Sequence, residues 1–313
     1  MSGCDAPRMP GLRPSWRVAL AAALAVVLGG CSIRRTAVNK FGDALAESST
    51  NFSADEDLEL VGDAIPFGLK TMEGLLDEAP RHRGLLAACT SGFVQYAYGW
   101  VQMEADIVEA KDLQRATEMR ARAQKLYLRA REYGLRGLEL EAPTLRADLQ
   151  RDPNAALARM KKKDVVLLYY TALAWAGAIS LKVNDSELSA DQPIVEALAR
   201  RALELEPCFN LGSIHDFFIS WESARSTIGG SVERAREHFE ADLACAQGRR
   251  AFPYVAFAEN VSVVKQDKAQ FKELMEKALS FDVSKRDDQR LANLLAQKRA
   301  RFQLGRIDEL FIE

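Results

Sequence analysis

The sequence predicts an all-α fold, and three observations lead to this prediction. Apolar residues recur at steps of three and four along residues 53–313. No segment after the leader shows the alternation of apolar and polar residues that is typical of a β-strand. The motifs LLDEAP, LELEAP and LELEP each end at a proline, namely Pro80, Pro143 and Pro207, where a helix cannot continue. We therefore expect stacked antiparallel helix pairs.

The first residues have the pattern of a secretory leader. Residues 1–17 are basic, and residues 18–28 are uncharged and apolar but too few to span a bilayer as a helix. Residues 28–31 read Leu-Gly-Gly-Cys, which resembles the lipobox of bacterial lipoproteins. We expect removal of residues 1–30 and acylation of Cys31, because two or more acyl chains hold a protein stably on a membrane. The alternative is an ordinary signal peptide that happens to end at a cysteine.

The next segment predicts a tether and a location. Residues 31–52 are polar and weakly patterned, which suits a linker between a lipid anchor and a folded domain over residues 53–313. Ser32 follows the cysteine where an aspartate would retain a lipoprotein in the inner membrane, by resemblance to sorting in diderm bacteria. We expect a protein of the bacterial cell envelope, facing the periplasm and anchored to the outer membrane by lipid alone.

Composition and motifs argue against several classes of function. The chain has 42 basic and 44 acidic residues and a formal net charge of -2, so it has no basic field for nucleic acid. The sequence contains no nucleophile elbow, no Gly-rich phosphate loop and no HExxH motif. Its histidines lie far apart, and no cysteine pair has zinc-site spacing. We expect no enzyme, no metal and no cofactor.

Three cysteines remain once Cys4 leaves with the leader and Cys31 is acylated. Cys89 lies on an apolar helix stripe and is expected in the core. Cys208 lies near the start of one expected helix and Cys245 near the end of its antiparallel neighbour, so the two should be adjacent. Either they form a disulfide in the oxidising compartment, or they are independent thiols.

The first expected helices follow the domain start in order. Ser53 and Glu56 fit a capping box before an apolar stripe that ends at Pro80. Residues 85–107 then carry one long apolar face, and residues 113–141 form a long charge-rich helix. Residues 165–183 are apolar nearly all round, which predicts a central helix buried on most sides.

The second half predicts one more TPR-like helix, two further helix pairs and a cap. Residues 194–207 read IVEALARRALELEP, and residues 268–282 read KAQFKELMEKALSFD; each looks like the second helix of a tetratricopeptide (TPR) repeat. Helices are also expected over 208–226, 231–246 and 254–266, and a last one over 287–304. The fold is thus expected to be built from degenerate TPR-like repeats, which commonly bind peptides, proteins or ligands.

Four runs resemble a known family, the TatT component associated with TRAP-type transporters. They are CSIRRTAVNKFGDALAESSTNFSADEDLELVGDAIPFGLKTMEGLL (31–76), CTSGFVQYAYGWVQMEAD (89–106), SIHDFFISWESAR (213–225) and GRRAFPYVAFAENVSV (248–263). The resemblance implies a periplasmic lipoprotein that works with a solute-binding protein and a membrane permease. It also implies a homotrimer and an apolar channel through each protomer for small organic ligands.

The aromatic and polar residues that could line such a channel form three groups. Together they exceed what one helix stripe can bury, so some should face a cavity or a partner; alternatively they are packing residues of helix pairs. Glu222 and Arg225 could orient a polar ligand or form an ordinary surface ion pair. The candidates are Tyr96, Tyr98, Trp100, Tyr169, Tyr170, Trp175, His215, Phe217, Phe218, Trp221, Glu222 and Arg225.

Two functions from different classes follow from these features. The first is an accessory lipoprotein of a TRAP-type transporter that binds a solute-binding protein and a small organic ligand. The second is a general TPR-type scaffold for envelope protein assembly that binds no small ligand. An apolar channel would favour the first, and a solid core with an open groove would favour the second.

Overall fold

The structure is a computed structural model that describes residues 40–44, 52–182, 184–227, 229–285 and 287–312. Over these residues it contains helices and no strands, so the predicted all-α class is confirmed. The predicted leader, the tether and Cys31 lie outside the described residues, apart from the short stretches 40–44 and 52. No helix in the described part of the chain is long and apolar enough to cross a membrane.

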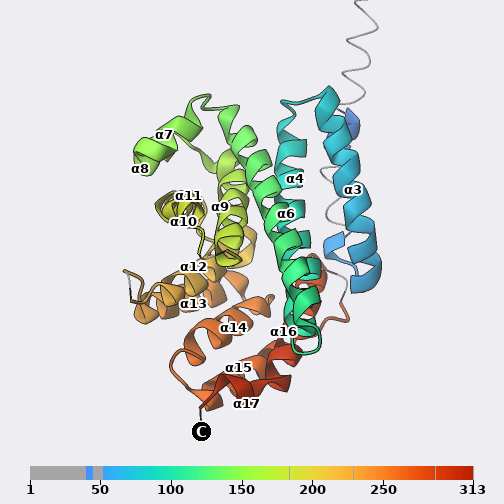
Figure 1. Cartoon of the computed structure of the whole chain (residues 1–313), viewed down its shortest axis with the longest axis vertical. Helices are drawn as coiled ribbons and strands as arrows, with labels where there is room; N and C mark the ends of the chain where they lie inside the picture. The colour runs from blue at the N-terminus through green and yellow to red at the C-terminus, as the bar shows by residue number, and fades with distance from the viewer. Residues whose placement is uncertain (1–39, 45–51, 183, 228, 286, 313) are drawn as a thin grey trace, which may run out of the picture.

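The N-terminal half is a layer of long helices (Figure 1). α4, α6 and α9 lie side by side, and α3 covers the outer side of α4. α4 continues without a break through the π-helix η1 into α5. The elements are α3 (Leu58–Glu78), α4 (Arg83–Tyr96), η1 (Ala97–Gln102), α5 (Met103–Val108), α6 (Leu113–Glu139), α7 (Leu145–Arg151), α8 (Pro153–Leu157), η2 (Lys162–Asp164) and α9 (Val165–Ser180).

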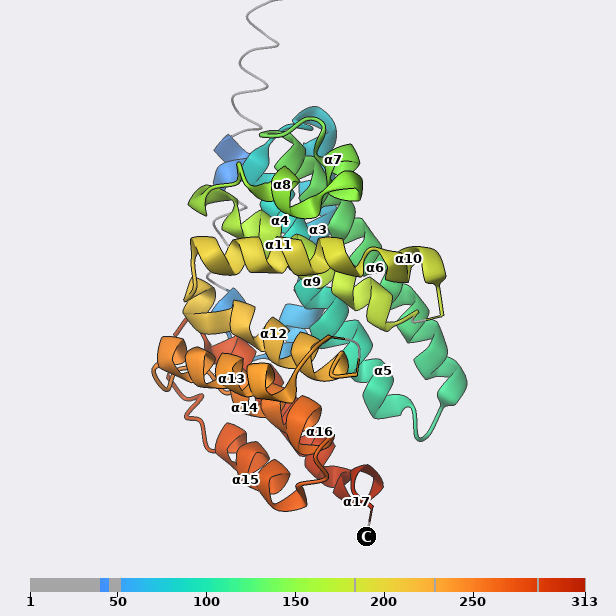
Figure 2. The ribbon, with the colours of Figure 1, turned by 90° about the vertical axis from the view of Figure 1, so that its left-hand side faces the viewer.

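The C-terminal half consists of shorter helices stacked below this layer. Figure 2 shows α11, α12 and α13 running across the long helices, with α15 and α17 at the far end. The elements are α10 (Ser186–Ala190), α11 (Gln192–Leu205), η3 (Phe209–Gly212), α12 (Ser213–Ala224), α13 (Val232–Ala246), α14 (Phe252–Phe257), η4 (Ala258–Ser262), α15 (Lys268–Leu279), α16 (Arg290–Gly305) and α17 (Ile307–Leu310).

The start of α3 differs from the sequence expectation. The expected capping box of Ser53 and Glu56 would start the helix earlier, whereas α3 begins at Leu58. Asp57 is the N-cap, and its carboxylate accepts hydrogen bonds from the amides of Glu59 and Leu60 at 3.0 and 2.9 Å. A capping carboxylate also interacts favourably with the helix dipole, and the sequence offered several acids at this point.

Glycines set the spacing of α6 and α9. A Cβ atom on Gly134 would lie 2.0 Å from Thr171 Oγ1, and one on Gly137 would lie 2.7 Å from Leu167. On α9, a Cβ on Gly177 would lie 2.8 Å from the Tyr127 ring. Both helices therefore approach closely because these positions have no side chain.

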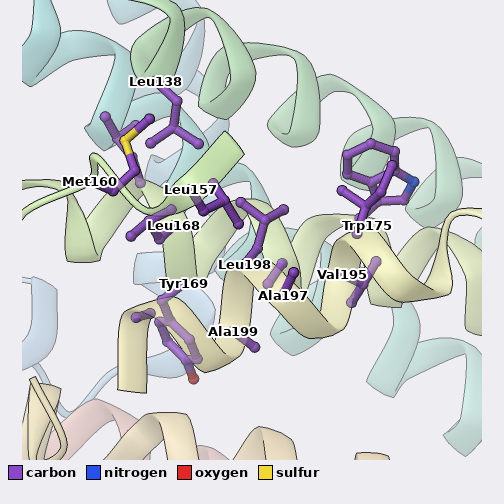
Figure 3. Packing of buried hydrophobic residues seen from close by; sticks show 14 of the residues in the cluster. Leu138, Leu157, Met160, Leu168, Tyr169, Trp175, Val195, Ala197, Leu198 and Ala199 are labelled. Carbon is purple, nitrogen blue, oxygen red and sulfur yellow. The ribbon is translucent and has the colours of Figure 1, made fainter. Parts of the chain in front are cut away.

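The buried apolar residues form three clusters. One lies around α9, α11 and the start of α12, and part of it is drawn in Figure 3, where Tyr169 and Trp175 mark two ends. A second joins α3, α4, α6 and η1, and a third joins α14, α15 and α16. α9 contributes to the first and second clusters, as expected for a helix that is buried on most sides.

Candidate functional site

Two tyrosines in the interior are both desolvated and partly accessible. Tyr98 lies in η1 and packs edge-on against Phe252 of α14, with ring centroids 6.0 Å apart. Tyr170 lies in α9 against Tyr169. Burial raises the pKa of both the Tyr98 and the Tyr170 hydroxyl, yet both side chains retain accessible surface. The two residues are thus surrounded by protein and yet are not closed off from solvent.

Tyr169 connects α9 to the start of α12. Its hydroxyl donates a hydrogen bond to the carbonyl of Ser213 at 2.8 Å, and its ring packs against Phe209 of η3 with centroids 5.7 Å apart. Burial raises the pKa of this hydroxyl far above its usual value. Tyr169 is therefore a neutral donor that fixes the loop before α12.

Next to this loop lies a buried group of charges that the sequence did not reveal. Arg250 donates to Asp242 at 2.8 Å and also forms an ion pair with Asp216, and all three side chains are buried. Oδ1 of Asp216 and Oδ2 of Asp242 accept no hydrogen bond from the described residues, but the two carboxyls lie within hydrogen-bonding reach of each other. Burial and then the charge of Asp216 raise the pKa of Asp242 well above its ordinary range, so this carboxyl is neutral.

The loop above this group has an unusual backbone. Asn210, Leu211 and Gly212 all have positive φ, at 44°, 57° and 104°. The Leu211 carbonyl accepts from Arg250, and a Cβ on Gly212 would lie 2.6 Å from Asp242 Oδ1. Left-handed conformations in non-glycine residues persist only where the surroundings hold them, so the buried arginine and aspartate fix this loop.

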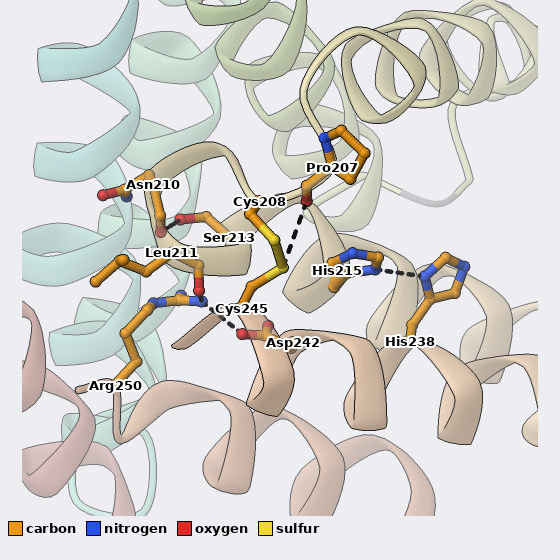
Figure 4. The surroundings of a disulfide bond; sticks show 10 residues. All are labelled: Pro207, Cys208, Asn210, Leu211, Ser213, His215, His238, Asp242, Cys245 and Arg250. Carbon is orange, nitrogen blue, oxygen red and sulfur yellow. Dashed lines mark hydrogen bonds and ion pairs between the residues drawn. A yellow bond between two sulfur atoms is a disulfide. The ribbon is translucent and has the colours of Figure 1, made fainter. Parts of the chain in front are cut away.

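A disulfide fastens the same region (Figure 4). Cys208 and Cys245 are bonded, with Cα atoms 5.2 Å apart, at the start of η3 and the end of α13. The bond lies beside the strained loop and Asp242, as Figure 4 shows. The sequence left open whether Cys208 and Cys245 form a disulfide or remain independent thiols, and the structure contains the disulfide. Cys89 is a buried free thiol.

His215 pairs with a residue that the sequence analysis did not select. Its Nδ1 lies 2.9 Å from Nδ1 of His238 on α13. Burial lowers the pKa of His215, and burial together with the His215 ring lowers the pKa of His238 to about 4. Both rings are thus neutral near pH 7, and one donates to the other.

The remaining candidates on α12 pack among themselves or pair with other helices. Phe217 stacks on Trp221 with centroids 5.3 Å apart, and Phe218 is fully buried against His238. Glu222 and Arg225 do not pair with each other. Glu222 is buried and binds Arg200 and Arg234, whereas Arg225 pairs with Glu196 at 2.6 Å and lies over the Trp221 ring.

Three other candidates lie away from this interior. Trp100 donates its indole hydrogen bond to the Leu58 carbonyl at 2.8 Å and so joins η1 to α3. Tyr96 stacks on Trp100 and lies under Arg122. Trp175 is buried at the far end of α9 under Arg131. The structure therefore brings Tyr98, Tyr169 and Tyr170 toward α12 and α14. Tyr96, Trp100 and Trp175 lie elsewhere.

A second group of charges joins the two halves of the chain. Arg299 of α16 pairs with Asp106 of α5 at 2.6 Å and with Glu259 of η4 at 2.5 Å. Asp106 also accepts from Arg120 at 2.8 Å. The charges of Arg299, Glu259 and Asp106 also influence the Tyr98 hydroxyl. The group thus borders the same interior.

Four of the charged residues missed in the sequence occur in the runs that carry the family resemblance, whereas Asp242 and Arg299 lie outside them. Asp106 ends the run 89–106, Asp216 lies in 213–225, and Arg250 and Glu259 lie in 248–263. Each is a charged residue in a run rich in apolar and aromatic residues, and this contrast could have drawn attention to it. The charged residues meet only in the folded protein, so helical periodicity could not have predicted which of them pair.

Comparison with known proteins identifies the family of the chain. A family model described as "TRAP transporter T-component" matches residues 54–311. The chain belongs to this family. A relative in Treponema pallidum, an uncharacterized protein, is 26% identical over 320 residues, which cover 96% of this chain and 99% of the relative. The TRAP transporter T-component family is an accessory component of a transport system and not a known class of enzyme.

The described residues offer no site for a metal ion. Within them, no three His, Cys, Asp or Glu side chains lie close enough together to hold one. The polar groups of the interior are instead tyrosine hydroxyls, the neutral carboxyl of Asp242 and the guanidinium of Arg250, which is paired with Asp216. Such a set can bind and orient a small molecule by hydrogen bonds and ring contacts.

Proposed function

We propose that this TRAP transporter T-component binds a small organic ligand in the interior between η1, α9, α12 and α14. The observation that carries the proposal is that Tyr98 and Tyr170 have desolvated hydroxyls while both residues keep accessible surface. Phe209 and Phe252 extend the aromatic surroundings on either side. A ligand here would be largely apolar, because the groups that face it are mostly rings.

The polar end of the ligand would meet the Asp216–Arg250–Asp242 group. A neutral Asp242 carries one O–H that can donate to Asp216 or to the ligand, and the remaining carboxyl oxygens of the group can accept from the ligand. A hydroxyl or carbonyl group on the ligand would suit this site better than a second charge, because a buried unpaired charge costs several kcal/mol.

The proposed partner is a periplasmic solute-binding protein of the same transport system. Membership of the T-component family supports a role beside the transporter, and we propose that the homotrimer implied by the sequence resemblance is the binding form. We also propose that the helix pairs are degenerate TPR-like pairs and that Cys31 anchors the protein by lipid, facing the periplasm at the outer membrane.

Ligand binding can be tested by native mass spectrometry of the full-length protein, followed by mass spectrometry of small molecules released on denaturation. We expect a released organic compound, and we expect Tyr98→Trp and Tyr170→Trp to lower its occupancy by filling its space. Tyr254→Trp is the matched control, because Tyr254 packs in the C-terminal cluster with Phe281. Equal occupancy in all variants, or no ligand at all, would contradict the proposed site.

The partner and the anchor need separate experiments. In the same spectra, a trimer that captures the solute-binding protein supports the transport role, whereas a monomer without that partner supports the envelope scaffold. For the anchor, Cys31→Ser should release the protein from membranes, and Cys4→Ser should not, because Cys4 belongs to the expected leader. Retention of Cys31→Ser on membranes would exclude lipidation at that residue as the anchor.

A further inference from the structure

Arg131 of α6 is a partly buried arginine whose guanidinium lies over an aromatic ring but has no acceptor for its hydrogen bonds among the described residues. It has no ion pair and no hydrogen bond with any residue that the structure describes, and its Nε is shielded from solvent. Burial lowers the pKa of this guanidinium. Arg129, one half-turn away, shows the usual arrangement: it stacks on Phe93 at 5.5 Å and pairs with Glu73 at 3.6 Å, although it is more exposed.

Trp175 supplies a second unpaired donor at the same place. The centre of the Arg131 guanidinium lies 4.7 Å from the Trp175 ring centroid. The indole Nε1–H of Trp175 is buried and has no acceptor among the described residues. A buried donor without an acceptor is costly and rare in native proteins, and a missing ion or ligand is one of its recognised causes.

Helix packing holds the two residues in place. α6 and α9 run against each other closely, because Gly134 leaves room for Thr171 one turn from the arginine and the tryptophan. Trp175 belongs to the cluster with Ile194 and Val195 of α11, and Figure 3 shows it beside Val195. The donors therefore lie on rigid helices and not on a loop, as a preorganised site requires.

The charges near Arg131 do not satisfy it. Asp191, at the start of α11, attracts the guanidinium from beyond ion-pairing distance and accepts a hydrogen bond from Gln150 at 3.3 Å. Glu132 is already bound in two hydrogen bonds to Arg146, at 2.8 and 2.7 Å. The site thus has one guanidinium that forms no direct ion pair with a described residue, and two N–H donors of different residues.

We propose that Arg131 and Trp175 form a binding site for the carboxylate of a small organic acid. A carboxylate is planar and accepts two parallel hydrogen bonds from a guanidinium, and a second oxygen lone pair can accept from the indole N–H. An aromatic or apolar group attached to the carboxylate would rest near the Trp175 ring. This site is distinct from the proposed interior site, because Trp175 lies under Arg131 of α6, whereas Tyr169 contacts Ser213 and Phe209 at the start of α12.

The test follows the indole N–H signals of the full-length protein, labelled with 15N in its tryptophan side chains, during titration with benzoate. The chain has 4 tryptophans, and the signal of Trp175 is identified by its loss in Trp175→Phe. We expect a saturable shift of that signal with benzoate and none with benzamide, the uncharged analogue, or with chloride at equal ionic strength.

Variants separate a binding site from a merely structural contact. Arg131→Gln should weaken benzoate binding roughly tenfold or more, because charge-assisted hydrogen bonds are lost. Arg136→Gln is the matched control on the same helix, since Arg136 also stacks on a ring, that of Tyr133, but already donates to the Pro80 carbonyl. Its affinity should equal that of the unmodified protein.

Asp191→Asn tests the competing explanation that Arg131 simply pairs with Asp191 in solution. If the site is for an external carboxylate, removal of this competing charge should tighten benzoate binding by about threefold. The proposal is overturned if Trp175 shows no saturable shift, if Arg131→Gln binds benzoate as well as the control does, or if Asp191→Asn weakens binding.

Discussion

Arg299 and Asp106 form an ion pair of 2.6 Å that joins α16, near the end of the chain, to α5 in its first half. Both side chains are largely buried, at 15% and 19% exposed. Glu259 of η4 accepts from the same guanidinium, so one arginine fastens three elements. The contact between the two halves thus depends on charge as well as on apolar packing.

Replacement of this arginine should loosen the junction. We expect Arg299→Met to lower the free energy of unfolding by about 3 kcal/mol, because Glu259 would remain largely buried without a cationic partner and Asp106 would keep only Arg120. Urea denaturation measures the effect. Lys277→Met is the control, since its pair with Glu273 is exposed and should contribute less than about 0.5 kcal/mol. Equal losses in both variants would mean that the buried pair has no special role.

A second prediction concerns the close approach of α6 and α9. Gly134→Ala places a methyl group 2.0 Å from Thr171 Oγ1, so the helices must separate, and we expect a loss of about 2 kcal/mol. Gly74→Ala in α3 meets nothing within 4 Å and should stabilise by roughly 0.5–1 kcal/mol through helix propensity. Thermal denaturation should move in opposite directions for the two variants, and a shared direction would contradict the packing argument.

The helices of this protein were largely predictable because periodicity and helix ends are local properties. The predicted helix over 113–141 corresponds to α6, Leu113–Glu139, and that over 165–183 to α9, Val165–Ser180. The polar stretch 144–163 was not predicted to be helical, yet it contains α7 and α8. Its apolar positions are too few for a clear stripe.

The candidate site was predicted less completely, for a physical reason. Aromatic residues stand out in a sequence, so Tyr98, Tyr169 and Tyr170 were selected. Asp242 and Arg250 were not, because a charged residue on a helix is usually solvated and only tertiary contacts bury it. Likewise, the partners of Glu222 and Arg225 are on other helices, which spacing within α12 could not show.

The disulfide supports a third prediction. Cys208 and Cys245 have a sequence separation of 37. Closing a loop of that length lowers the entropy of the unfolded chain, which should stabilise the folded state by about 4 kcal/mol. Replacing both by serine should therefore lower the denaturation midpoint. Dithiothreitol should do the same to the unmodified protein and should leave the double variant unchanged. A further loss in the double variant would point to a different bond.

Cys89 should be unreactive in the folded protein. Burial raises the pKa of its thiol to about 12, so almost no thiolate exists at pH 8. We expect iodoacetamide to leave Cys89 unmodified in native protein and to alkylate it in urea, as measured by peptide mass spectrometry. Rapid native labelling would mean that α4 opens locally.

The last prediction concerns acid and the histidine pair. Burial and the neighbouring His215 lower the pKa of His238 to about 4 in the folded state. Between pH 6.5 and 4, His238 is therefore protonated in the unfolded chain but largely neutral in the folded protein. The unfolded state then binds more protons, so stability falls as the pH decreases from 6.5 toward 4, by up to about 1.4 kcal/mol per pH unit. Urea midpoints between pH 5 and 6.5 should show this slope, and His238→Gln should flatten it. His82 is present in both proteins, so it cannot account for a difference in slope. Equal slopes would mean that His238 accepts its proton in the folded state as readily as in the unfolded chain.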